Sequence, residues 1–495
     1  MAQFTLGVDV GTTGTKTVLV DVSAARIVAQ ASRESRLIAD RAGHAEADPQ
    51  QWIDNVHSTI REVLHTAGAS AGDVGALATT GMVPAVVPVD RRGEPVRRAL
   101  LQNDARATSE IETLRATMDP AATLAATGSA ITQQSVAPTA MWLRHNESQN
   151  WRDTTALVGS YDWVLMALGA APHVELNWAI ESGLATLQGA PYDAAFTAAE
   201  LTPDLVPEVL APGSTAGSLD AAAAAATGLR EGTPLVVGGA DHVLSAYAAG
   251  VNSPGDWLVK LGGAGDVLAA SDTPVVDARL YLDAHPVPGR WLPNGCMATS
   301  GSLIRWFQTL VGGTELTALD DEAAQRSPAD VLCLPYFLGE KSPLHDPDLR
   351  GAFVGLDLVH TRADMYRAVL EAIAFGFKHH TEVFADIGVR LGPAMVTNGG
   401  SRSVLWKQIL ADVLDLPLWP VIGHPGASLG AALAAAVGVG MVTGWDDIDR
   451  FRTLGEPVEP DPRHTGRYAE AYGQWRELGA VLTPVSHRLA RKDNQ

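Results

Sequence analysis

The sequence contains little cysteine, little positive charge and no long apolar run. Only Cys296 and Cys333 are present among 495 residues, so there is no disulfide framework and no cysteine spacing typical of a metal site. Acidic residues outnumber basic ones by 56 to 36, and the net charge of −20 argues against nucleic acid or an anionic membrane as a partner. The longest apolar run, residues 429–441, is too short to span a bilayer and is expected to form a buried helix.

No targeting signal is expected from the residues at the start of the sequence. It opens directly into a strand, with neither a basic segment nor an apolar signal core ahead of that strand. Together with the small number of cysteines, this predicts a reducing cytoplasm as the location of the protein.

What is present describes a globular chain with two α/β domains. Hydrophobic residues make up 46% and charged residues 19%, and the length exceeds the roughly 250–300 residues beyond which a single core stops growing. Hairpin strands followed by a helix that begins at Asp48-Pro49 predict mixed sheets flanked by helices. The expected strands are about residues 4–10, 16–22, 27–31, 76–80 and 85–90, and the helix carries Trp52, Val56, Ile60 and Leu64 on one face.

A glycine turn follows the first strand. Residues 11–15 (Gly-Thr-Thr-Gly-Thr) separate two apolar strands, and glycines let the backbone approach an anion closely, so this turn is a candidate phosphate cradle. Asp9 at the end of the strand could hold a magnesium ion or its water shell. A Walker loop and a dinucleotide fingerprint both fit poorly, because a strand and not a helix follows. An ordinary hairpin without a ligand remains compatible with this stretch alone.

The same pattern returns in the second half of the chain. After a helix-rich middle segment, residues 104–230, apolar strands are expected at residues 234–241 and 257–261, and the second runs into Gly-Gly-Ala-Gly-Asp. Two related domains, each with a phosphate turn, would account for this repetition. A further strand at residues 394–400 enters a Gly-Gly turn, between amphipathic helices expected at residues 364–380 and 403–416.

Several motifs in order along the chain resemble a known family. Residues 351–356 (Gly-Ala-Phe-Val-Gly-Leu), followed after a gap by Asp364-Met365 and by residues 368–371, are similar to the second signature of the FGGY carbohydrate kinases. Residues 335–343 and 345–351 also resemble family segments. The chain is therefore identified as a member of this family, resembling in particular its xylulokinase-like branch, from about residue 4 to residue 441.

The resemblance implies an α/β fold of the two-domain actin-like ATPase (ribonuclease H-like) type. The expected domains are residues 1–248, which bind sugar and carry the first phosphate turn and the catalytic Asp241, and residues 249–495, which bind ATP. The implied cofactors are ATP and Mg²⁺, with Asp9 as the residue that holds the metal. The nucleotide-binding residues that it implies are Gly11, Thr12, Thr13, Gly14, Thr15 and Lys16 in the first turn, Gly262, Gly263 and Gly265 in the second, and Gly399, Gly400, Ser401, Gln408 and Asp412 beside the adenosine. Lys16 either contacts phosphate or is an ordinary surface lysine.

Asp241 is the candidate catalytic residue. It ends the strand at residues 234–240, and the resemblance makes it the general base that takes the proton from the attacking sugar hydroxyl. The pattern alone favours Asp241 as the N-cap of the following helix, the resemblance favours the general base, and the two roles can coexist.

Sugar recognition is where the chain departs from its relatives. By resemblance the sugar would contact Met82, Val83, Asn103 and Asp104, besides Asp241. Val83 stands where a histidine is usual, and loss of that donor is expected to change which polyol fits. Gln102 replaces a tryptophan of the family pattern, and Thr139 stands where lysine is common.

These observations predict an ATP-dependent kinase that phosphorylates a hydroxyl of a small sugar, with a ketopentose such as xylulose as the first choice. Another ketose, a sugar alcohol or a sugar acid remains open as the substrate, and a non-catalytic sensor on the same fold is the rival class. A homodimer is common among relatives of this kind. The adjacent His379 and His380 have no spaced third metal ligand and are expected at the polar end of their helix.

Overall fold

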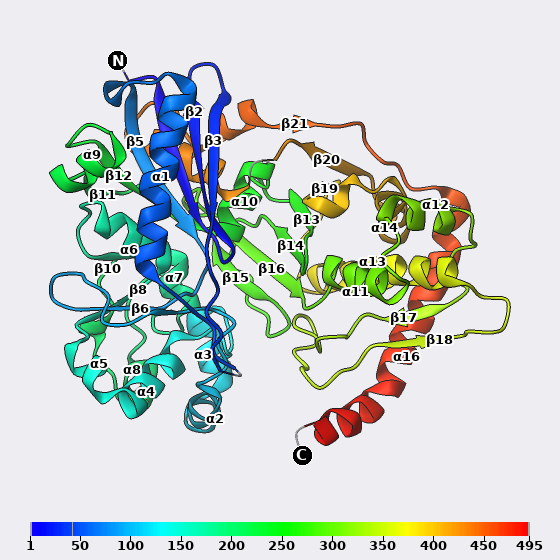
Figure 1. Cartoon of the computed structure of the whole chain (residues 1–495). Helices are drawn as coiled ribbons and strands as arrows, with labels where there is room; N and C mark the ends of the chain where they lie inside the picture. The colour runs from blue at the N-terminus through cyan, green and yellow to red at the C-terminus, as the bar shows by residue number, and fades with distance from the viewer. Residues whose placement is uncertain (1, 42, 425, 494–495) are drawn as a thin grey trace. The chain divides into compact units, whose positions relative to one another are not determined.

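The computed structural model describes residues 2–41, 43–424 and 426–493, and its chain divides by contacts into two compact units (Figure 1). Unit 1 comprises Met1–Gly250, Leu282–Leu292 and Pro425–Phe451, and unit 2 comprises Val251–Tyr281, Pro293–His424 and Arg452–Gln495. The predicted two-domain α/β organisation is confirmed. The predicted division of roles at residues 248–249 stays a prediction. Among the described residues, no helix is both long enough and apolar enough to cross a bilayer.

Unit 1 is built on a six-stranded mixed sheet of order β11-β12-β5-β1-β2-β3. Strand β1 pairs antiparallel with β2, which pairs antiparallel with β3, while β5 and β12 extend the sheet from β1 in parallel. The bounds are β1 Phe4–Val10, β2 Gly14–Asp21, β3 Arg26–Glu34, β5 Val74–Gly81, β11 Thr215–Ser218 and β12 Pro234–Ala240. The carboxyl ends of β1, β5 and β12 therefore lie at one edge, because parallel neighbours run in the same direction.

Helices cover both faces of this sheet. Helix α1 (Pro49–Ala67) begins as predicted, with the Asp48 side chain accepting from Gln50 N at 3.0 Å, and it lies along β2 and β3 (Figure 1). The Thr59 hydroxyl of α1 hydrogen bonds to that of Thr17 at 2.7 Å. On the other face lie α15 (Ala427–Gly438) and α10 (Asp241–Ala249). They share a hydrophobic core with the β2 residues that alternate with Thr17 and therefore point to the opposite side of the sheet. The apolar run near residue 429 is thus a buried helix, as predicted.

Unit 2 repeats the pairing scheme of unit 1. The second sheet has the strand order β15-β16-β14-β13-β19-β20-β21; β13 pairs antiparallel with β14 and parallel with β19, which pairs parallel with β20. Residues Leu282–Leu292, which include most of β15 and the start of β16, belong to unit 1. The bounds are β13 Trp257–Leu261, β14 Gly265–Ala269, β15 Tyr281–Ala284, β16 Trp291–Met297, β19 Ala394–Thr397, β20 Leu418–Ile422 and β21 Thr453–Leu454. Each unit therefore begins its sheet with a central strand, a glycine turn and an antiparallel return strand.

The long helix α13 (Arg362–Asp386) corrects one prediction. Val369, Ile373 and Phe377 are fully buried, as the apolar stripe predicted. His379 and His380, however, do not lie at a polar helix end, because the helix continues for six residues beyond them. His380 is fully buried, its Nδ1 lies 2.8 Å from Gly376 O and its Nε2 lies 2.9 Å from the Ser342 hydroxyl. His380 is therefore a core residue, and its neighbour His379 is also largely buried.

The remaining elements complete the two units. In unit 1 they are β4 Glu46–Ala47, β6 Val87–Val89, β7 Ala99–Leu100, α2 Thr108–Thr117, α3 Pro120–Thr127, α4 Val136–Asn146, α5 Ser148–Asp153, β8 Ala156–Val158, α6 Ser160–Ala167, β9 His173–Glu175, α7 Leu176–Glu181, α8 Asp193–Ala199, β10 Glu208–Leu210 and α9 Ala221–Thr227. In unit 2 they are α11 Gly301–Leu310, α12 Leu316–Ala324, β17 Leu332–Leu334, β18 Ala352–Val354, α14 Val404–Leu414 and α16 Pro462–Asp493. The middle segment is helix-rich, as predicted.

Candidate active site

The first glycine turn connects β1 to β2 at the edge of the unit 1 sheet. Gly11 N donates to Gly14 O at 3.0 Å and closes the turn. A Cβ atom on Gly14 would lie 2.6 Å from Arg33 O, so only glycine fits that position. A Cβ atom on Gly11 would lie 4.0 Å from Asp9 Oδ1, which shows that the Asp9 carboxylate is close to the turn.

Asp9 and Lys16 are cross-strand partners just behind this turn. Burial lowers the pKa of Lys16, and the charge of Asp9 opposes that shift. Thr15 is fully buried in β2, whereas Thr13 is exposed at the tip of the turn. The second hairpin has the same cross-strand pair with its charges exchanged, because Lys260 Nζ lies 3.3 Å from Asp266 Oδ2.

Thr12 joins the first turn to the predicted sugar-binding residues. Its hydroxyl lies 3.7 Å from Met82 Sδ and accepts from Gln102 Nε2 at 3.3 Å. Met82 N in turn donates to Val10 O at 3.2 Å, so Met82 is fixed against the end of β1. Gln102, which replaces the tryptophan of the family pattern, thus has a structural partner in the first glycine turn.

The other predicted sugar-binding residues differ in their exposure and in the hydrogen-bond partners that they already have. Val83 is buried, and Asn103 is exposed. Asp104 accepts from Ala45 N at 2.6 Å and forms a double hydrogen bond with the guanidinium of Arg106, at 2.8 and 2.7 Å. Burial acts to raise the pKa of Asp104, but the hydrogen bonds from Arg106 hold that pKa below its ordinary value. Asp104 is therefore ionised and already paired with a cation.

Asp241 lies beside Met82 at the same sheet edge. Strands β5 and β12 pair in parallel with Gly81 opposite Ala240, so Met82 and Asp241 are the residues that follow this pair on neighbouring strands. Asp241 is the first residue of α10, where Ala240 occupies the N-cap position without a side-chain cap. Its side chain is 40% exposed. A carboxylate that is open to solvent at a sheet edge is able to reach a substrate hydroxyl.

Three further ionisable side chains gather around Asp241. His242 Nε2 lies 2.8 Å from Asp283 Oδ2 and 3.9 Å from Glu181 Oε1, while His242 Nδ1 lies 3.6 Å from Asp241 Oδ1. Ligand atoms of Glu181, His242 and Asp283 all lie within 4.8 Å of one another, a spacing that a cation could also bridge. The hydrogen bond from His242 to Asp283 accounts for this proximity without an ion.

In unit 2, two glycine-containing turns lie next to each other. They follow the parallel strands β13 and β19, in which Lys260 pairs with Thr397. A Cβ atom on Gly262 would lie 3.3 Å from Asn398 Nδ2. Gly263 and Gly399 are exposed, and a Cβ atom on either would have no neighbour within 4 Å. These two positions leave open space where a nucleotide could approach the backbone.

The residues around these turns have defined structural roles. Gly400 must be glycine, since its Cβ atom would lie 2.2 Å from the Trp406 ring. The Ser401 hydroxyl donates to Asn398 O at 2.6 Å. On α14, Gln408 Nε2 donates to Asp412 Oδ1 at 2.7 Å, and Asp412 is buried. Asp412 also accepts from Asp461 N at 2.8 Å, so it fixes the segment that enters α16.

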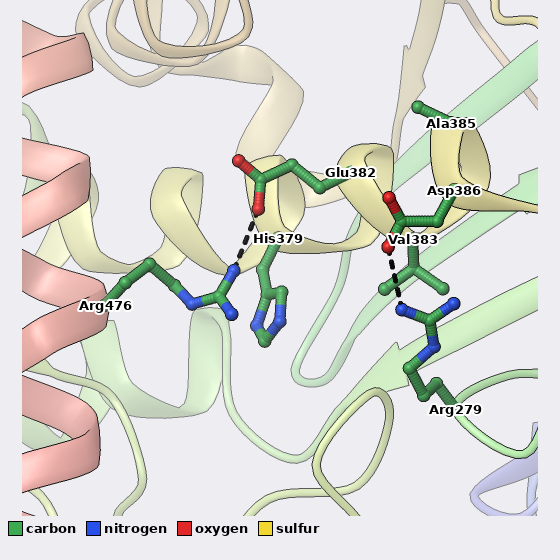
Figure 2. A pocket seen from close by; sticks show the side chains of 7 residues that line it. All are labelled: Arg279, His379, Glu382, Val383, Ala385, Asp386 and Arg476. Carbon is green, nitrogen blue, oxygen red and sulfur yellow. Dashed lines mark hydrogen bonds and ion pairs between the residues drawn. The ribbon is translucent and has the colours of Figure 1, made fainter.

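A separate pocket of about 360 Å³ lies elsewhere in unit 2 (Figure 2). Arg279 Nη1 is 2.9 Å from Asp386, and Arg476 Nη1 is 2.8 Å from Glu382. Burial lowers the pKa of His379 to about 3, so this lining histidine is neutral. The lining includes none of the residues predicted to bind ATP or sugar, and each of its arginines is already paired.

Comparison with known families gives the class of the protein. The N-terminal domain of the FGGY family of carbohydrate kinases matches residues 4–248, and the C-terminal domain of that family matches residues 258–439. The chain therefore belongs to the FGGY family of carbohydrate kinases, and it is an ATP-dependent sugar kinase.

Among individual relatives, xylulose kinases recur. The xylulose kinase of Bacillus subtilis (strain 168) is 25% identical over 483 residues, which cover 96% of each chain. The crystal structure of xylulose kinase from Rhodospirillum rubrum is 41% identical, with a TM-score of 0.91 over 97% of this chain and 99% of that one. Plasmodium falciparum glycerol kinase with ADP, at 17% identity, has a TM-score of 0.88 over 96% of this chain and 98% of that one, which shows the same fold. The expected two-domain actin-like ATPase fold is thereby confirmed.

Sequence reasoning missed the group around His242. The sequence pattern around Asp241 predicts only the start of a helix, and it does not connect His242 with Asp283 or Glu181. The one available signal was an ionisable residue directly after the candidate base. The partners of His242 come from distant segments, so no local pattern indicated them.

Proposed function

We propose that this kinase transfers the γ-phosphoryl group of ATP to a hydroxyl of a ketopentose such as xylulose, with Asp241 as the general base. The observation that carries the proposal is the parallel register of β5 and β12, in which Met82 and Asp241 follow directly paired residues. The printed names of the relatives, xylulose kinases above all, support the substrate class.

The chain's own residues supply positioning and charge. In unit 1, the turn at Gly11, Thr12, Thr13 and Gly14 would hold phosphate oxygens through its backbone and hydroxyl donors. In unit 2, the open backbone at Gly263 and Gly399 would accept the nucleotide. Asp241 would accept the proton of the attacking hydroxyl.

Asp9 fits a magnesium ion bound together with ATP. Its carboxylate is close to the first glycine turn, and carboxylate oxygen is a ligand that Mg²⁺ prefers. When bound, Mg²⁺ would neutralise charge on the phosphate groups. Nucleic acid and membranes are not expected as partners, a reducing cytoplasm stays the expected location, and a homodimer stays a prediction.

Replacement of the base tests this proposal. We expect Asp241→Asn to bind ATP but to phosphorylate sugar at least ~10²-fold more slowly, the scale of a lost general base. Asp193→Asn is the matched control, because Asp193 is also the first residue of a unit 1 helix and is exposed. The measurement is sugar-dependent ADP release with a panel of pentuloses, hexuloses, alditols and aldonates. Near-wild-type turnover of Asp241→Asn would exclude Asp241 as the base.

The same panel tests the substrate. Because Val83 lacks the hydrogen-bond donor of histidine, another ketose, a sugar alcohol or a sugar acid could replace xylulose as the preferred substrate. A higher kcat/KM for one of these than for xylulose would change the substrate but not the reaction.

A further inference from the structure

His242 bridges two carboxylates that differ in exposure. On one side Asp283, whose side chain is 2% exposed, lies 2.8 Å from His242 Nε2. On the other side Asp241, 40% exposed, lies 3.6 Å from His242 Nδ1. The imidazole thus lies between a buried anchor and the carboxylate assigned here as the general base.

The anchor is itself held in place. Ala284 N donates to Asn177 Oδ1 at 2.7 Å, and Asn177 Nδ2 donates back to Ala284 O at 3.0 Å. Asn177 is fully buried in α7, the helix that ends at Glu181. Since Asp283 directly precedes Ala284, its carboxylate has little freedom to move.

The charged groups that face His242 come from three elements: Asp241 from α10, Glu181 from α7 and Asp283 from β15. Burial acts to lower the pKa of His242, but these carboxylates, Asp283 first, raise that pKa well above its ordinary value. Burial and the charge of Asp283 raise the pKa of Glu181 well above its usual range, so Glu181 tends to keep its proton. Glu175 also interacts with Asp283, and burial raises the pKa of Glu175 to about 7.

The protonation state of His242 determines whether Nδ1 is a hydrogen-bond donor or an acceptor. As an imidazolium, both ring nitrogens carry a proton, so one faces Asp283 and the other faces Asp241 as donors. When the imidazolium loses one of its two ring protons, Asp283 holds the remaining proton on Nε2. Nδ1 then presents a lone pair to the Asp241 carboxylate. That arrangement is repulsive, and Asp241 would turn away.

We propose that His242, anchored on Asp283, is a positioning residue that orients the Asp241 carboxylate toward the substrate hydroxyl. This inference rests on the proposed role of Asp241 as the general base. The separation of 3.6 Å is an ion-pair distance, and a small side-chain rotation shortens it to a hydrogen bond. A carboxylate fixed in this way loses no orientational freedom when the sugar binds.

The pH dependence of kcat tests the proposal. Because the pKa of His242 is raised, its proton is retained above pH 6.5 and lost only as the pH rises through that raised value. We expect kcat of the wild type to fall at alkaline pH, and Asp283→Asn to move this fall to lower pH by about one unit or more, since an opposite charge is removed.

Direct replacement of the histidine gives the second measurement. His242→Gln is expected to lower kcat by about 10- to 100-fold, to leave the KM for ATP unchanged and to abolish the alkaline fall. His173→Gln is the matched control: His173 is also a unit 1 histidine near a carboxylate, with Nε2 3.8 Å from Asp162, and we expect its pH profile to match the wild type.

Three results would overturn the inference. The first is a wild-type kcat and pH profile in His242→Gln while Asp241→Asn is inactive, which would leave the proposed function intact. The second is an increase in the KM for sugar alone, which would make His242 a substrate contact. The third is a stoichiometric transition metal in the wild type that His242→Gln loses. Full activity of Asp241→Asn would instead reject the proposed function itself.

Discussion

At the scale of single residues, burial sets the charge of several acids. Glu340 is 6% exposed, and its Oε1 accepts from Ala298 N at 2.7 Å and from Lys341 N at 2.8 Å. Burial raises the pKa of Glu340 to about 7, although these hydrogen bonds oppose the shift. The folded protein therefore keeps a proton on Glu340 at a pH at which the unfolded chain has released it.

This difference predicts a pH dependence of stability. The folded pKa exceeds the unfolded one, so the contribution of Glu340 to stability is present below pH 4.5 and is lost as the pH rises through 7. We expect Glu340→Gln to reduce the loss of unfolding free energy between pH 6 and pH 8 by about 1 kcal/mol. Urea unfolding at both values checks this, with the exposed Glu456→Gln as control. An unchanged loss in Glu340→Gln would contradict the prediction.

The position of a single residue was predictable from the sequence where that residue stands at the end of a strand. Asp9 and Asp241 each end a short apolar strand, and the structure places each at a sheet edge. The pairing of Asp104 with Arg106 and that of His242 with Asp283 were not predicted. The Asp104–Arg106 pair lies in a turn, where no hydrophobic periodicity indicates contacts. The His242–Asp283 pair joins residues that are 41 positions apart in the sequence.

At the scale of elements, helix α15 packs closely against its neighbours because glycines stand at the points of contact. A Cβ atom on Gly7 of β1 would lie 1.9 Å from Ser428 O, and one on Gly430 of α15 would lie 2.5 Å from Leu244 O. The helix backbone therefore touches β1 and α10 directly, and its alanines fill the remaining space.

Added methyl groups at these contacts are expected to destabilise unit 1. Because backbone atoms are in the way, Gly7→Ala and Gly430→Ala should each cost about 3 kcal/mol of unfolding free energy or more. Gly473→Ala is the control, since Gly473 lies in α16 with no atom near its Cβ position, and it should gain about 0.5–1 kcal/mol. Thermal unfolding measures all three. A stable Gly7→Ala variant would mean that α15 is free to shift.

Elements with strong local signals were predictable from the sequence. The cap at Asp48, the apolar stripe of α1 and the strands around both glycine turns all formed as predicted. The prediction that His379 and His380 lie at the polar end of their helix is wrong, because a pair of polar side chains inside a long helix resembles a helix end in the sequence. Gly376 O and the Ser342 hydroxyl lie within hydrogen-bond distance of the two ring nitrogens of His380 and satisfy them inside the core, and no local sequence pattern indicates those partners.

At the scale of the whole molecule, the two sheets share one pairing scheme, which supports the predicted internal repeat. The difference lies at the turns. The first carries two threonines between its glycines, whereas the second has Gly263 and Ala264 there. Sequence similarity between the repeats is confined to a few residues, so only the order of strand pairing makes the relationship clear.

Nucleotide binding should stabilise the folded protein. A ligand at 100 times its Kd adds about 2.7 kcal/mol to the unfolding free energy, so Mg²⁺ and ADP are expected to raise the unfolding temperature. Gly399→Val should fold normally, since a Cβ atom there has no neighbour within 4 Å, but it should lose this increase because the side chain fills the open space. The exposed Gly466→Val is the control and should keep it. A full increase in Gly399→Val would contradict the nucleotide assignment.

The return of residues 425–451 to unit 1 has a consequence for protein synthesis. Helix α15 covers one face of the first sheet, yet the ribosome makes it only after most of unit 2. Until then, the apolar side chains of β2, β5 and β12 on that face can pack against α10 but lack the contacts that α15 adds. An expressed fragment that stops at residue 250 would therefore lack part of the core of unit 1.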